Sequence, residues 1–145
     1  MPVRYGKNDI AVGHASNHER ITRKEGELSA ASMPGTVGHF DENLRFVPSN
    51  TGDLAVLDRD FLSGKTAQDA IPEGQYICAI PCKPKLFLNV LMDKGLDVKY
   101  GYAMYINEAG LATNVAPAGG GKIFGYAEES VVTSDAPKLI VIHIA

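Results

Sequence analysis

The sequence predicts an all-β fold: one domain built as a β-sandwich or β-barrel, with a jelly roll as one form of it, preceded by an extended N-terminal arm. Turn-forming Gly, Pro and Asn residues recur at nearly every strand length between residues 71 and 129. The runs between them are rich in Tyr, Ile, Val, Leu and Phe, as expected for strands of about five or six residues. This spacing leaves little room for a long helix.

We assign residues 1–18 to the arm and residues 19–145 to the β domain. The arm is polar and shows neither a helical nor a strand period. A segment of this kind is ordered only where a neighbour pins it. The sequence leaves open whether that neighbour is the chain's own domain or another subunit.

Strands are expected throughout the β domain. The predicted runs are 20–23, 28–33, 36–40, 44–47, 54–57, 75–80, 86–92, 100–106, 111–113, 123–127 and 138–144. The run 86–92 would also suit two helical turns, but the β-formers around it favour a strand. Glu25-Gly26 is interpreted as a turn, and residues 66–70 as the best candidate for a helical turn. The last run is apolar on both faces, so we expect a central strand.

The best-defined local prediction is a hairpin between the runs 100–106 and 111–113. Its loop is Asn107-Glu108-Ala109-Gly110, in which Gly110 can supply the left-handed residue that such loops use. In the first of these runs, Tyr100 and Tyr102 share one strand face. An apolar ring with a polar tip suits a protein interface or an ordinary sheet edge.

Metal and catalytic motifs are weak in this chain. His14 and His18 stand four residues apart, but the surrounding residues give little evidence of a helix, and a third ligand such as His39 would have to come from a distance. We therefore expect no metal site and no cofactor. Cys78 and Cys82 on one strand would have Cα atoms roughly 13 Å apart, too far for a disulfide.

Composition limits the possible partners. The chain has 145 residues, a hydrophobic content of 45% and a net charge of −3. The acidic balance argues against a nucleic-acid partner, because phosphate binding needs a basic excess. Since no apolar run reaches the roughly 18 residues of a membrane span, we expect no membrane partner and synthesis in the cytoplasm.

Several segments together resemble a known family. They are 19–27 with the turn 34–35, then 60–64, 71–76, 96–101, the hairpin 107–111, and 124–129 before the last strand. Their order is similar to that of the head decoration, or cement, proteins of tailed bacteriophages. The likeness covers residues 19–145. It consists of turns and strand edges and includes no catalytic signature.

The resemblance implies a non-enzymatic viral structural protein. Such proteins bind the outer surface of the phage capsid as homodimers or homotrimers and clamp neighbouring major capsid protein subunits. The arm fits this role, because an ordered arm adds contact area. The residues predicted to contact the capsid are Arg4, Tyr5, His14, His18, Arg20 and Arg23, which are polar, close to the arm and able to pair with an acidic surface.

Two alternatives remain at the level of sequence. One is a small oligomeric β-fold enzyme of the dUTPase type, although its Arg-Ser-Ser stretch and Gly-rich tail are missing and the chain ends in the apolar residues 140–145. The other is a cupin-like binding module, although the cupin spacing of the first histidines is also missing.

Overall fold

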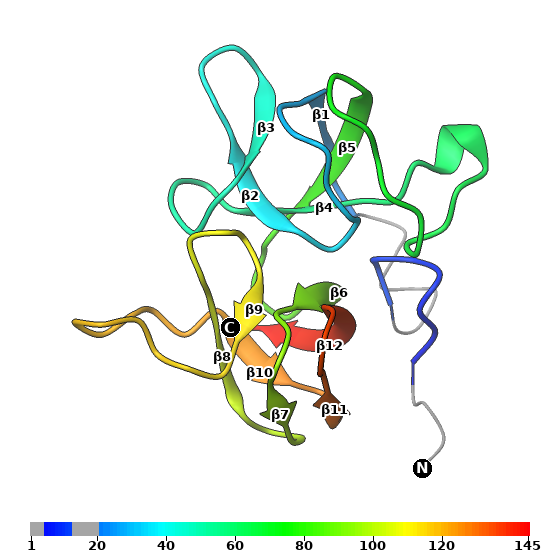
Figure 1. Ribbon diagram of the computed structural model, residues 1–145. Coiled ribbons are helices and arrows are strands. Elements are labelled where there is room, and N and C mark those ends of the chain that lie inside the picture. The colour runs from blue at the N-terminus through cyan, green and yellow to red at the C-terminus, as the bar shows by residue number, and fades with distance from the viewer. Residues whose placement is uncertain (1–4, 13–20) are drawn as a thin grey trace.

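The computed structural model describes residues 5–12 and 21–145 and confirms the all-β class. Two closed five-stranded barrels follow one another along the chain. Figure 1 shows the first barrel above the second, with the N-terminal segment running alongside. The first barrel contains β1 (Lys24–Leu28), β2 (Val37–Phe40), β3 (Arg45–Pro48), β4 (Ala55–Leu57) and β5 (Tyr76–Pro81). The second contains β6 (Phe87–Met92), β8 (Ala103–Ile106), β9 (Ala112–Thr113), β10 (Gly125–Ala127) and β12 (Lys138–Ile144).

The two barrels share one topology. The strand order around the first barrel is β1-β3-β2-β4-β5, and the corresponding order around the second is β6-β9-β8-β10-β12. Each barrel contains one parallel pair at the same place, β1 with β3 and β6 with β9. The sequence shows no internal repeat, so this duplication exists only at the level of strand connections.

Two smaller elements interrupt this plan. A two-stranded sheet of β7 (Asp97–Val98) and β11 (Val131–Val132) is attached to the second barrel. A short 3-10 helix, η2 (Phe61–Ser63), projects from the link between β4 and β5 (Figure 1). The predicted strand runs did not include β7 or β11, which are only two residues long.

The interior of each barrel is apolar. Leu28, Phe46, Leu57 and Ile77 fill the first barrel. A larger cluster fills the second barrel and continues into the first through Val37, Val56 and Ile80. All three residues of β4 are buried, because one face of this strand points into its own barrel and the other faces the second barrel.

The barrels are joined by backbone hydrogen bonds as well as by side chains. The Val37 N–H donates to the Gly110 carbonyl at 2.8 Å, and the Leu91 N–H donates to the Gly35 carbonyl at 2.8 Å. A Cβ atom added at Gly110 would overlap the Val37 carbonyl oxygen. The predicted hairpin is confirmed, with Gly110 at φ 81°. Its glycine therefore serves both the turn and the junction between the barrels.

Four local predictions are wrong. The predicted strands 20–23 and 28–33 are not formed: residues 21–23 are irregular, and after Leu28, the last residue of β1, only Ser32 pairs, in an isolated bridge with Ile71. Residues 66–70 form no helix; the Asp69 carboxylate instead accepts a hydrogen bond from the Thr66 N–H at 2.8 Å, which closes a turn. Glu25 and Gly26 lie inside β1 and not in a turn. Gly26 is needed there because a Cβ would overlap the Leu44 carbonyl and the Phe40 ring. The last strand, β12, is confirmed as central, since it pairs with both β6 and β10.

Candidate functional site

The described part of the arm, residues 5–12, docks on the second barrel of its own chain. Ala11 forms an antiparallel bridge with Leu88 of β6. The Val12 N–H donates to the Phe87 carbonyl at 3.2 Å. Ile10 is completely buried in the shared core. The arm therefore adds both backbone pairing and a core side chain to this barrel.

Asn89 of β6 holds the arm in place. Its side chain points to the outside of the barrel, yet it is completely buried. The Nδ2 atom donates to the carbonyls of Gly6 and Asp9, both at 2.9 Å. The Oδ1 atom accepts a hydrogen bond from Lys7 Nζ at 3.0 Å. Because a buried polar group is costly unless it is hydrogen-bonded, β6 requires the arm to be present.

Beyond Asn89 the same outer face of β6 and β12 carries Leu91 and Leu139, which are only 7% and 6% exposed. This cross-strand pair forms the floor of a cleft of about 920 Å³ between the barrels. The first barrel and its loops contribute Met33, Ala67 and Gln68 to the walls. The remaining walls come from Lys7 of the arm and from residues 128–131 and 136–138, with Tyr100 at the rim. The lining is mostly apolar, which is typical of binding pockets.

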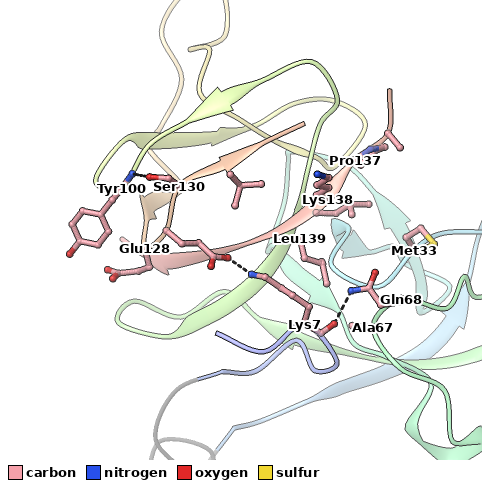
Figure 2. A pocket seen from close by; sticks show the side chains of 14 residues that line it. Lys7, Met33, Ala67, Gln68, Tyr100, Glu128, Ser130, Pro137, Lys138 and Leu139 are labelled. Carbon is pink, nitrogen blue, oxygen red and sulfur yellow. Dashed lines mark hydrogen bonds and ion pairs between the residues drawn. The ribbon is translucent and has the colours of Figure 1, made fainter. Parts of the chain in front are cut away.

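Charged groups lie around this cleft in balanced number. Lys7 forms an ion pair with Glu129, whose Oε1 also accepts from the Val141 N–H at 3.1 Å. The backbone carbonyl of Lys7 accepts a hydrogen bond from Gln68 Nε2 at 3.0 Å, as Figure 2 shows. Glu128 lies 3.7 Å from His143 Nδ1, and Lys138 stands on the opposite wall. The lining thus carries two ammonium groups and two carboxylates.

Metal-ligating side chains do not cluster within the described residues. Among residues 5–12 and 21–145, no three His, Cys, Asp or Glu side chains gather closely enough to hold a metal ion. The Lys7–Glu129 pair is already engaged with the backbone and with Asn89, which suits a structural role.

No helix within the described residues is long and apolar enough to cross a membrane.

Both cysteines are free thiols. Burial raises the pKa of Cys78, and the nearby carboxylate of Glu25 raises it further. Burial, with a smaller contribution from Asp53, raises the pKa of Cys82 to about 12. Because the thiolate is the reactive form, neither cysteine is suited to be a nucleophile.

The predicted capsid-contact residues are only partly placed by the structure. Arg4, His14, His18 and Arg20 lie outside the described residues, as does the proposed boundary between residues 18 and 19. Tyr5 packs edge-on against Phe87, with ring centroids 6.3 Å apart. Arg23 Nε donates to the buried carboxylate of Asp58 at 2.7 Å. These residues remain predictions as capsid contacts, and Arg23 also neutralises a buried charge.

The cleft was not predicted from the sequence. Its residues come from the arm, both barrels and the loop before β12, so no local pattern joins them. One signal was available at Asn89, a single polar residue inside the apolar run 86–92. A buried amide in such a position implies that another segment supplies its hydrogen bonds.

Comparison with known proteins gives a likeness of fold. No protein-family model matches the sequence, and no curated protein matches it. Among solved structures, the chain is similar to the N base of head fiber gp8.5 in bacteriophage phi29. The TM-score is 0.54 at 15% sequence identity, and the match covers 86% of this chain and 94% of that chain. At this identity the likeness concerns the fold alone.

Proposed function

We propose that this chain is a structural protein of a bacteriophage virion that binds the outer surface of the capsid. In this proposal it stabilises the capsid by clamping neighbouring major capsid protein subunits, acts as a homodimer or homotrimer, and catalyses no reaction. The observation that carries the proposal is the match of fold, over 86% of the chain, to the base of a phage head fiber. The resemblance of residues 19–145 to phage decoration proteins supports the same class.

The architecture suits attachment to a lattice. The arm bonds to both barrels, through Asn89 on the second and through Arg59 on the first, whose Nε donates to Asp9 at 2.5 Å. The two barrels and the arm therefore form one rigid body with a large surface. A rigid body loses little conformational entropy on binding, and repeated contacts within an oligomer add through multivalency.

Co-sedimentation with mature heads that lack the protein tests this function. The purified chain should pellet with mature heads, saturate at a fixed ratio to the major capsid protein, and stay in solution with unexpanded heads. Saturated heads should also retain their DNA at a higher temperature than bare heads. Failure to bind mature heads contradicts the proposal, and binding without any gain in heat resistance contradicts the clamping role.

The predicted contact residues can be tested in the same assay. Replacing Arg4 and Arg20 together by Ala should weaken binding to heads, whereas replacing Lys94 and Lys122 by Ala removes the same charge elsewhere and should not. Arg23 is a poor probe, because its loss would leave the buried Asp58 unpaired. Equal binding by both double variants would remove the arm from the interface.

A further inference from the structure

Two apolar features of the described surface are relevant to binding. One is the cleft between the barrels. The other consists of Phe61 and Leu62 on η2, with exposed fractions of 39% and 82%; the Arg59 guanidinium lies 6.0 Å from the centroid of the Phe61 ring and leaves Leu62 as the more open of the two. We call these two residues the prong. A single exposed leucine is ordinary on a protein surface. Two adjacent apolar side chains on a projecting turn, with an apolar cleft nearby in the chain, are typical of an interaction site.

The prong is held rigidly. Asp60 caps η2 by accepting a hydrogen bond from the Ser63 N–H at 3.4 Å, and its other oxygen accepts from Gln75 Nε2 at 2.5 Å. Gly64 closes the turn in the left-handed conformation, and its N–H donates to the Phe61 carbonyl at 3.2 Å. Because the turn is already fixed, binding through it would cost little further ordering.

The prong and the cleft lie close together in the chain. Ala67 and Gln68, which form one wall of the cleft, follow η2 after a link of only three residues, 64–66. One region of the molecule therefore carries both an apolar projection and an apolar recess. Such a surface is complementary to a second copy of itself, as interfaces between identical subunits require.

We propose that the prong of one copy inserts into the cleft of a second copy. Leu62 would then cover the floor formed by Leu91 and Leu139. Within the described part of the chain, Asp60 beside the prong has no cation partner and Lys138 on the cleft wall has no carboxylate partner, so this contact brings opposite charges together. The balanced charge around the cleft also favours a neutral apolar side chain over a charged ligand. This inference rests on the homo-oligomer of the proposed function, for which it names the contact, and does not depend on binding to capsids.

Light scattering across a range of protein concentrations tests the contact. The wild-type chain should have a mass that is a multiple of the 15.5 kDa protomer. Leu62→Asp removes the anchor, and Ala136→Trp fills the cleft from its exposed rim. Each should weaken self-association by about 30-fold, which is typical of losing a central anchor. The matched controls are Leu44→Asp, at another exposed leucine, and Ser134→Trp, outside the cleft; both should assemble like the wild type.

Mixing the two variants separates a lost contact from a folding defect. Leu62→Asp keeps an intact cleft and Ala136→Trp keeps an intact prong. Equal amounts should therefore form a mixed oligomer that neither variant forms alone. A monomeric wild type, or unchanged assembly of Leu62→Asp, overturns the inference. If the wild type is monomeric but Leu62→Asp loses binding to heads, the prong serves a different protein and self-association is rejected.

Discussion

The two barrels have the same strand order but are completed in different ways. The first has its own interior cluster around Phe46. The interior of the second belongs to a larger cluster that includes the junction and Ile10 of the arm. The same five-stranded topology can therefore close either around its own side chains or with side chains supplied by other segments. We infer that the first barrel depends mainly on its own packing, whereas the second depends on the arm and on the first barrel.

The largest effect is expected from emptying the first barrel. Phe46→Ala removes a completely buried ring and should lower the free energy of unfolding by about 3–5 kcal/mol. Because strands of the first barrel also contribute Val37, Val56 and Ile80 to the cluster of the second, unfolding in urea should still be a single transition by circular dichroism and by tyrosine fluorescence. Two separate transitions would show that the barrels are independent. Tyr102→Phe, at an exposed site, serves as the control and should change stability by less than about 0.5 kcal/mol.

The junction itself should be the next most sensitive place. Gly110→Ala puts a side chain at positive φ and into the Val37 carbonyl, so we expect a loss of about 2–4 kcal/mol. Gly101→Ala is the matched control, since Gly101 also has positive φ but nothing lies within 4 Å of an added Cβ. It should cost only about 1 kcal/mol. Equal losses in urea denaturation would mean that the close approach between the barrels does not matter.

The dependence of the second barrel on the arm can be tested at Asn89. Asn89→Ala removes three side-chain hydrogen bonds to the arm and should cost about 1–3 kcal/mol. Amide hydrogen exchange should rise at Val12 and in β6 but not within the first barrel. Asn50→Ala, which loses one bond of 3.3 Å to the Ile106 carbonyl, is the milder control. A uniform rise in exchange would contradict the asymmetry between the barrels.

The smallest effect concerns the two thiols. The raised pKa of Cys82, about 12, means that the folded state holds this proton more tightly than the unfolded chain does. Stability from this site is therefore complete below a pH of about 9 and is lost as pH rises toward 12, with a slope of at most about 1.4 kcal/mol per pH unit. The slope of the unfolding free energy against pH should flatten in Cys82→Ala, measured against the wild type in urea at each pH.

At neutral pH a thiol reagent should modify Cys78 before Cys82.

Much of the fold could be predicted because β-strands leave local signals. Turn residues marked the strand ends, Gly110 marked the hairpin, and the apolar run 138–144 marked a central strand. The errors arose where a residue's role depends on a distant neighbour. Gly26 resembles a turn glycine in the sequence, but it is a strand residue pressed against Phe40. The turn at residues 66–70 has helix-forming residues, but the Ala67 N–H donates to the distant Asn8 carbonyl at 2.9 Å, and the Asp69 side chain closes the turn locally.

The sequence by itself determined the all-β class and most strand positions, because alternation and turn chemistry act over a few residues. Only the tertiary structure decided that there are two barrels of one topology, that the arm completes the second, and that a cleft opens between them. These features arise from strand pairing and from contacts between residues up to 122 positions apart in the sequence, as between Lys7 and Glu129. No local pattern encodes such pairings, since each depends on how all the strands close together.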